Sequence, residues 1–271
     1  MAARPHNPIA TRIVTISRLV FTVVAVCIVI AVLARWNSRH NTTPPLDVLF
    51  PSGELIIAVD PSYPPFAAFG DNGLFGLDID LGKEIGARIG LPVRFVSMGY
   101  DGLYDSLRVG QTDAIISALL MDGSRLGDVR YSRYYYDDGL ALVSPVDRPK
   151  AEMEAMVGHR LAYAFGSTAD AEARQWLRRI GPFETAPYEL PRYALDAVRL
   201  QMADAALVDA TTARQYLTEY PDWDADFEYV THSLFAIAVR RDRVFEWELI
   251  DEAIQQMRDD GTLDQIINRW L

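Results

Sequence analysis

The chain has 271 residues, of which 50% are hydrophobic and 23% charged, so it can form one large domain or two small ones and is not a disordered protein. Five arginines precede the first acid, Asp47, and the rest of the chain carries 21 lysines and arginines against 37 acids, a net charge of about −16. So acidic a body argues against nucleic-acid binding, because contacts to phosphates need clustered cations.

Residues 19–34 form an apolar run without a charge, and arginines stand on both sides of it. A cationic flank followed by an apolar run is typical of a secretory signal peptide or of a membrane anchor whose positive end stays inside the cell. We therefore expect residues 1–36 to form a hydrophobic helix that is either cleaved off or retained in the inner membrane, where residues 13–36 would be the anchor. In both cases the body that follows is exported to a periplasmic or other extracytoplasmic location.

The only cysteine, Cys27, lies inside this apolar run, so the exported body has no disulfide and depends on its hydrophobic core. Residues 37–52 are polar and contain prolines, which is typical of a linker. The four histidines are scattered, and the chain has neither a Gly-Lys-Ser/Thr phosphate loop nor a G-x-S-x-G nucleophile elbow. We therefore expect no metal, no cofactor and no catalytic residue.

Apolar and amphipathic segments alternate after the linker, and this alternation predicts an α/β protein. Short apolar or alternating runs predict strands at 54–59, 93–97, 114–120, 139–143, 160–163, 205–208 and 233–239. Apolar side chains at helical spacing predict helices at 78–89, 103–109 and 193–202, and two more near the C-terminus. The loop at 60–66 contains three prolines, which stiffen it and would hold its side chains in fixed positions, as a binding site requires.

The predicted strand at 114–120 leads within a few residues to a cation, Arg125. A similar pattern recurs at 198–207, where a helix end runs through a turn into Asp-Ala and an apolar strand, and this second strand leads to an anion, Asp209. In open α/β sheets, ligands bind beyond the carboxyl ends of the strands. Two such units, one with a cation and one with an anion, suggest that a zwitterion is held between two lobes.

The stretch Phe-Gly-Ser-Thr at 165–168 stands between a predicted strand and a helix. Free backbone N–H groups and the hydroxyls of Ser167 and Thr168 at a helix N-terminus can bind an anion. Either hydroxyl can equally serve as the N-cap of the helix, and the two roles are compatible.

Several segments together carry a family resemblance. They are LIIAVDPSYPPF at 55–66, NGLFGLDIDLGKEIGARIG at 72–90, MGYDGLYDSL at 98–107, DAIIS…SR at 113–125, YSRYYYDDGLALV at 131–143, FGST at 165–168, DAALVDA at 204–210 and FAIAVRRD…DDGTLDQIINRWL at 235–271. In this order, from residue 54 to the C-terminus, the chain resembles the extracellular solute-binding proteins of the polar amino-acid ABC uptake systems, bacterial solute-binding protein family 3.

The resemblance implies a two-lobed periplasmic binding protein fold of type II, with two α/β lobes joined by two crossing strands. Lobe 1 would comprise residues 53–144, completed by 236–271, and lobe 2 would comprise residues 145–235. The resemblance also implies a monomer that closes on an amino acid and delivers it to an ABC permease in the inner membrane. The N-terminal segment would be the contact with the membrane, and neither nucleic acid nor a cofactor is involved.

The resemblance also indicates the ligand-contacting positions. Arg125 would pair with the ligand α-carboxylate, since a guanidinium fork matches its two oxygens, and Asp209 would bind the α-ammonium. Tyr63 and Tyr100 would sandwich the ligand side chain, and Asp60 would lie near its far end. The full set implied by the resemblance is Asp60, Tyr63, Tyr100, Ser117, Arg125, Ser167, Thr168 and Asp209.

The chain departs from the family pattern next to Arg125. Leu119 and Leu120 stand where a small or hydroxyl residue is usual, and Asp122 places an anion three residues before Arg125, where it could compete for the guanidinium.

Two other functions stay open. One is an enzyme on the same fold, similar to cyclohexadienyl or arogenate dehydratases, which would need a buried acid with a raised pKa. The other is a tethered sensory ectodomain.

Overall fold

The computed structural model describes residues 44–271. The expected hydrophobic N-terminal helix and residues 37–43 of the expected linker lie outside the described residues. The chain divides into a unit of residues 1–48 and a unit of residues 49–271, and the short helix α2 (Leu46–Leu49) lies at the boundary. Within residues 44–271, no helix combines the length and the apolar character that crossing a membrane requires.

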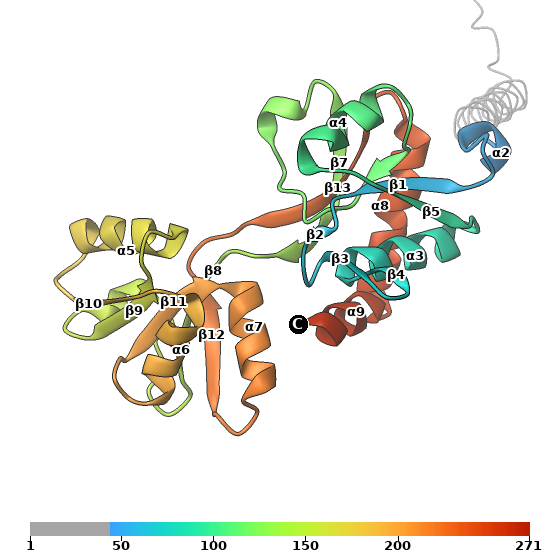
Figure 1. Ribbon diagram of the computed structural model, residues 1–271. Coiled ribbons are helices and arrows are strands. Elements are labelled where there is room, and N and C mark those ends of the chain that lie inside the picture. The colour runs from blue at the N-terminus through green and yellow to red at the C-terminus, as the bar shows by residue number, and fades with distance from the viewer. Residues whose placement is uncertain (1–43) are drawn as a thin grey trace, which may run out of the picture. The chain divides into compact units, whose positions relative to one another are not determined.

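The larger unit contains two separate five-stranded sheets, each with its own helices, which are the two lobes (Figure 1). The first sheet has the order β5-β1-β6-β13-β7, in which β1 runs parallel to β5 and β6, and β13 runs antiparallel to β6 and β7. The strands are β1 (Leu55–Val59), β5 (Val93–Ser97), β6 (Ala114–Ile115), β7 (Val129–Asp137) and β13 (Leu234–Arg240). The helices are α3 (Leu77–Ile89), α4 (Tyr100–Arg108), α8 (Val244–Asp259) and α9 (Thr262–Trp270). A small three-stranded sheet is formed by β2 (Ser62–Tyr63), β3 (Ala67–Gly70) and β4 (Gly73–Phe75).

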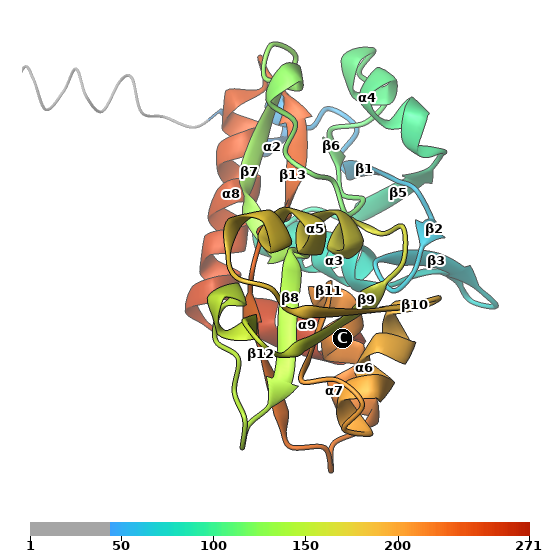
Figure 2. The ribbon, with the colours of Figure 1, turned by 90° about the vertical axis from the view of Figure 1, so that its left-hand side faces the viewer.

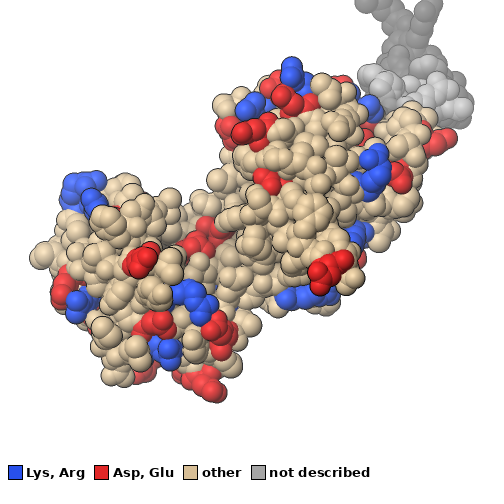
Figure 3. All heavy atoms as spheres, in the orientation of Figure 1, with Lys and Arg blue, Asp and Glu red and all other residues tan. Residues whose placement is uncertain are grey.

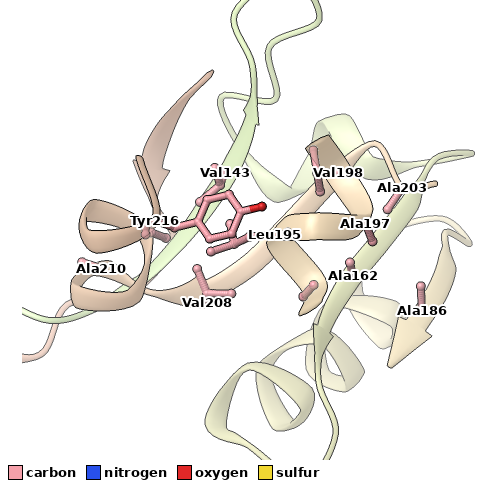
Figure 4. Packing of buried hydrophobic residues seen from close by; sticks show 14 residues of the cluster. Val143, Ala162, Ala186, Leu195, Ala197, Val198, Ala203, Val208, Ala210 and Tyr216 are labelled. Atoms are coloured by element: carbon pink, nitrogen blue, oxygen red, sulfur yellow. The ribbon is translucent and has the colours of Figure 1, made fainter. Parts of the chain in front are cut away.

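The second sheet has the order β10-β9-β11-β8-β12 and is covered by helices on both faces. Its strands are β8 (Leu140–Pro145), β9 (Arg160–Ala164), β10 (Glu184–Tyr188), β11 (Ala205–Asp209) and β12 (Ala225–Tyr229), and its helices are α5 (Thr168–Arg179), α6 (Pro191–Arg199) and α7 (Ala210–Glu219). Alternate residues of β11 enter two cores: Val208 packs with α6 and α7 around Tyr216 (Figure 4), whereas Leu207 packs on the α5 side. Burial on both faces explains why this strand is a continuous apolar run in the sequence.

The chain passes between the two sheets twice, from β7 to β8 and from β12 to β13 (Figures 1 and 2). The two connections lie against each other, since the Asp138 N–H donates to the Ser233 carbonyl across 2.9 Å and the Ser233 N–H donates to Oδ1 of Asp137 across 2.9 Å. A Cβ atom on Gly139 would lie 1.9 Å from the Thr231 carbonyl oxygen, so only glycine permits this approach. Strand β8, which precedes the expected lobe boundary at 144/145, pairs with β11 and β12; the expected domain limits stay a prediction.

The expected strand at 114–120 is shorter in the structure, where β6 ends at Ile115. Beyond it, side chains take part in the backbone contacts: the Ala118 N–H donates to Oδ2 of Asp78 across 2.7 Å, and Oγ of Ser117 accepts the Asp60 N–H across 2.9 Å. Ala118 has φ +43°, which non-glycine residues rarely adopt and which does not occur in a strand. The regular strand therefore ends several residues earlier than the apolar pattern predicts, and further on only an isolated bridge joins Leu120 to Phe235 of β13.

Candidate functional site

Four of the expected ligand-contacting residues lie together at the carboxyl ends of β1 and β6. They are Asp60, Tyr63, Tyr100 and Ser117, and they line a cavity of about 380 Å³ together with Ser62, Ala118, Leu120 and Phe235. The local contacts explain the arrangement: Ser117 accepts the Asp60 N–H, and Oδ1 of Asp60 accepts the Ser62 N–H across 3.0 Å. Leu120 is about half exposed in this cavity, so the departure from the family pattern adds an apolar side chain to its wall.

Tyr63 and Tyr100 present their rings to solvent, with exposed fractions of 50% and 48%. The Tyr63 ring is stacked on Phe66 with 5.4 Å between ring centroids and 8° between planes, and Phe66 is fully buried against Phe235. Partial burial, then the charges of Asp138 and Asp209, raise the pKa of the Tyr63 hydroxyl. Phe66 therefore supports one face of the Tyr63 ring, and the carboxylates of Asp138 and Asp209 lie near it. Such a ring can serve as a stacking surface for a ligand.

A buried carboxylate supports this half of the site. Asp78, in the first turn of α3, has no exposed surface; its Oδ1 accepts the Tyr135 hydroxyl across 2.7 Å and its Oδ2 accepts the Ala118 N–H. Burial raises the pKa of Asp78 to about 6, although both hydrogen bonds act in the opposite direction. Asp78 thus holds the backbone beside Ser117. Sequence reasoning missed this role, because an acid in the first turn of an amphipathic helix is normally solvated.

The second lobe contributes a cavity of about 540 Å³, whose lining includes Thr168 and Asp209, with Tyr63 from the first lobe. Asp209 is the N-cap of α7: its Oδ1 accepts the Thr212 N–H across 2.7 Å and its Oδ2 accepts the Thr212 hydroxyl across 2.8 Å. Ser167 is the N-cap of α5, and its hydroxyl donates to the Ala164 carbonyl across 2.7 Å, so this side chain is committed to local contacts. The cavity joins residues of both lobes.

Arg125 lies outside the lining of both cavities. Its guanidinium stands over the Tyr104 ring, 4.7 Å from the centroid, and its Nε lies 3.9 Å from Oδ2 of Asp122. It lines a different cavity of about 630 Å³, together with Tyr104 and Arg108. Asp122 caps the 3-10 turn Gly123–Arg125 by accepting the Ser124 N–H across 2.8 Å. Hydrogen bonding to the side chain and then the backbone of Ser124, followed by the charge of Arg125, lowers the pKa of Asp122. The pairing of Arg125 with a ligand carboxylate stays a prediction.

Two further acids line the second cavity without having been expected there, Asp138 and Glu172. Asp138 is half-buried in the connection from β7 to β8, and burial, then the charges of Asp209 and Asp137, raise its pKa to about 6 against the hydrogen bonds from Thr211. In Figure 3 the charged side chains visible between the lobes are acidic. In the sequence, Asp137 and Asp138 can be recognised as two adjacent acids after an aromatic-rich strand. Only the structure, in which two distant segments cross, shows that Asp138 lines the cavity.

Neither cavity has a cation in its lining, and within residues 44–271 no ion pair involves Asp60, Asp138, Glu172 or Asp209. The same part of the chain contains no group of three or more histidine, cysteine or acidic side chains that could hold a metal ion. The cleft is therefore an acidic, aromatic-walled space suited to an organic cation or zwitterion.

Comparison with known proteins places this arrangement in a family. Residues 55–271 match the model of the bacterial extracellular solute-binding proteins, family 3. The lysine/arginine/ornithine-binding periplasmic protein of Escherichia coli (strain K12) is 26% identical over 225 residues, which cover 79% of this chain and 86% of that protein.

The solved structures that are similar to this one include the following two. The L-cystine solute receptor of Neisseria gonorrhoeae, unliganded and open, has a TM-score of 0.71 at 19% identity and matches 83% of this chain and 95% of that one, so it shares the fold. The ancestral amino-acid-binding protein AncCDT-1, a precursor of cyclohexadienyl dehydratase, has a TM-score of 0.51 at 25% identity and matches 83% and 98%. With the two-lobed fold and the family match over residues 55–271, the chain belongs to the bacterial extracellular solute-binding proteins of family 3.

Proposed function

We propose that the protein is the binding component of an ABC uptake system, which captures an amino acid between its two lobes, delivers it to a membrane permease and catalyses no reaction. Its family and the names of its relatives support this function. The observation that carries the proposal is the cavity that Tyr63 of the first lobe shares with Thr168 and Asp209 of the second, because a ligand bound there would contact both lobes and draw them together.

The charge of the cavities points to a cationic amino acid. Four acids line the two cavities, Asp60, Asp138, Glu172 and Asp209, and their linings contain no lysine, arginine or histidine. A zwitterion brings one positive group, whereas an amino acid with a basic side chain brings two, and the second group would lie close to Asp60 at the first lobe. The lysine/arginine/ornithine-binding relative agrees with this ligand class.

In this proposal Asp209 binds the α-ammonium, and Tyr63 and Tyr100 enclose the ligand side chain. The backbone and hydroxyls at the start of α5, Ser167 and Thr168, bind the α-carboxylate together with Arg125, while Ser117 holds the loop of Asp60. Arg125 has to leave the Tyr104 ring to do so. The contacts that it would give up are weak, because the guanidinium is held by a cation–π contact and a 3.9 Å ion pair at an exposed site.

Calorimetry of the full-length chain, purified in detergent, against the twenty amino acids and ornithine tests this function. We expect micromolar dissociation constants for arginine, lysine or ornithine, which correspond to about −8 kcal/mol. Neutral amino acids of similar size are the matched controls and should bind at least tenfold more weakly. Absence of binding to every amino acid would contradict the proposal.

We also infer that the protein acts as a monomer outside the cytoplasmic membrane, and that residues 1–36 are either removed or kept, with 13–36 as the anchor. The support is the apolar, arginine-flanked run at 19–34. Mass spectrometry of the exported protein distinguishes a chain that begins near residue 35 from an intact one that sediments with membranes. Full-length protein free in the cytosol would overturn both forms of the inference.

One observation favours a second candidate, a dehydratase similar to cyclohexadienyl dehydratase. Asp138 is an acid in the cleft whose pKa is raised to about 6, and an acid with a pKa near neutrality is suited to protonating a leaving hydroxyl group. Incubation with prephenate and detection of phenylpyruvate test this activity. Product formation that Asp138→Asn abolishes would favour the enzyme, and its absence would favour the binding protein.

A further inference from the structure

Asp138 occupies the connection between the lobes and not the body of either one. Its N–H donates to the Ser233 carbonyl of the second connection, and its Oδ1 accepts the Thr211 N–H of α7 across 2.9 Å. The Thr211 hydroxyl in turn donates to the Tyr136 hydroxyl across 3.2 Å. The carboxylate is therefore fixed relative to the first turn of the helix that Asp209 caps, and both acids line the same cavity.

Part of the acceptor capacity of Asp209 is already used, since each of its oxygens accepts a hydrogen bond from Thr212. An ammonium group has three N–H donors and requires acceptors in more than one direction. Asp138 provides a second carboxylate in the same cavity, near enough for the charge of Asp209 to act on it, and within residues 44–271 no ion pair neutralises either of them.

We propose that Asp138 and Asp209 form a two-carboxylate seat for the ligand α-ammonium group, in which Asp138 determines affinity and makes binding sensitive to pH. The proposal rests on the proposed amino-acid-binding function and assigns a new residue to it. Because Asp138 also contacts the second connection and α7, the cation that it binds lies at the point about which the lobes would close.

The surroundings of Asp138 explain the sensitivity to pH. Asp209 and Asp137 are the nearby anions, Tyr63, Tyr136 and Tyr229 are the neighbouring hydroxyls, and Arg214 of α7 acts on the last two tyrosines. His232 pairs with Asp137, 2.5 Å away. Without ligand, burial and then the charges of Asp209 and Asp137 raise the pKa of Asp138 to about 6. A bound ammonium group favours the charged carboxylate, so binding below this pH expels a proton.

Calorimetry of the full-length chain with L-arginine at pH 5 and pH 8 tests the proposal. The affinity of the parent should rise roughly tenfold over this interval, since a site with a pKa of about 6 is mostly protonated at pH 5. Asp138→Asn, which keeps an acceptor for the Thr211 N–H, should bind at least tenfold more weakly at pH 8 and show no such rise. Glu228→Gln, which removes an exposed acid of β12, is the matched control and should behave as the parent.

A second ligand identifies the group that Asp138 serves. In 5-guanidinopentanoic acid a hydrogen replaces the α-amino group of arginine. The parent should bind it much more weakly than arginine, and Asp138→Asn should lose little further affinity for it. An Asp138→Asn variant that binds L-arginine as the parent does at pH 8 would overturn the proposal.

Proton release by the parent gives a measurement that needs no variant. Titrations at pH 6 in two buffers of different ionisation enthalpy should show about half a proton released per ligand bound, and at pH 8 almost none. No release at pH 6 in a parent that binds L-arginine would overturn this inference and leave the proposed function standing. A parent that binds no amino acid would overturn both.

Discussion

Tyr135 donates its hydroxyl to Asp78 across 2.7 Å in the buried interior of the first lobe, and the other carboxylate oxygen binds the backbone of Ala118. The two side chains come from β7 and α3, 57 positions apart in the chain. This contact fixes the turn that follows β6, so the wall of the cleft depends on a polar pair that contacts no ligand.

Tyr135→Phe removes the donor and leaves a buried carboxylate one partner short. We expect a loss of about 1–3 kcal/mol in the free energy of unfolding, the usual cost of an unsatisfied buried polar group. Denaturant unfolding monitored by circular dichroism measures it. Tyr134→Phe, in the exposed neighbouring residue, should change stability by less than about 0.5 kcal/mol. Equal effects of the two substitutions would show that the hydroxyl of Tyr135 is unimportant.

The pH dependence of stability should reflect Asp78, whose pKa rises from 3.8 to about 6 on folding. The folded state then binds this proton more tightly than the unfolded state, so the stabilisation is complete below pH 4 and is lost as the pH rises through about 6. A shift of about two units corresponds to about 3 kcal/mol. Unfolding of the unliganded protein between pH 4 and pH 7 measures the decrease. In Asp78→Asn the decrease due to this group should disappear, and an unchanged slope would contradict the assignment.

Tyr104 should compete with the ligand for Arg125. In Tyr104→Leu the guanidinium loses the ring under it, an interaction of about 0.5–1 kcal/mol at an exposed site, so affinity for a ligand carboxylate should rise two- to fivefold. Arg125→Ala should lose about 2–5 kcal/mol of binding energy, because it leaves the carboxylate without its partner. Arg108→Ala, which removes an exposed arginine of the same outer cavity, is the control and should bind as the parent does. Weaker binding by Tyr104→Leu would contradict the competition.

Asp209 has a structural role as well as the proposed ligand contact, and two substitutions separate them. Asp209→Ala removes the N-cap of α7 and should lower stability by about 0.5–2 kcal/mol, whereas Asp209→Ser keeps a capping oxygen and should change it by a few tenths. Both variants lose the charge, so both should bind an amino acid at least about 30-fold more weakly. Thermal unfolding and calorimetry are the two measurements. Parent-like affinity in Asp209→Ser would mean that the carboxylate does not bind the ligand.

Much of the fold was predictable because strands β8, β9 and β11 of the second sheet are buried on both faces and each helix has one apolar face. Strand β11 is a continuous apolar run, and α6 places Leu195 and Val198 on a single side, so periodicity alone identifies them. The predicted strand at 114–120 was too long. Ala118 is apolar and fits the pattern of a buried strand, but its backbone N–H donates to the side chain of Asp78. Such side-chain contacts leave no mark in the hydrophobic pattern.

The candidate site was predictable where it depends on strand ends. Asp60 and Ser117 stand just beyond β1 and β6, and Asp209 is the last residue of β11, as the rule for open sheets requires. The orientation of Arg125 was not predictable, since it depends on Tyr104 in a different helix. Asp138 was missed because its position depends on Ser233 and Thr211, more than 70 positions away.

The crossing of the chain between the lobes also determines the order in which the two lobes can fold. The second sheet uses only strands from 140 to 229, one uninterrupted piece of chain, whereas β7 of the first sheet has its neighbour only in β13, which begins at Leu234. During synthesis the second lobe can therefore fold while the first still lacks a central strand and helices α8 and α9. The first lobe's side of the cleft therefore depends on residues from 234 onward, and a chain that ended before β13 would have the strands of the second sheet but an incomplete first sheet.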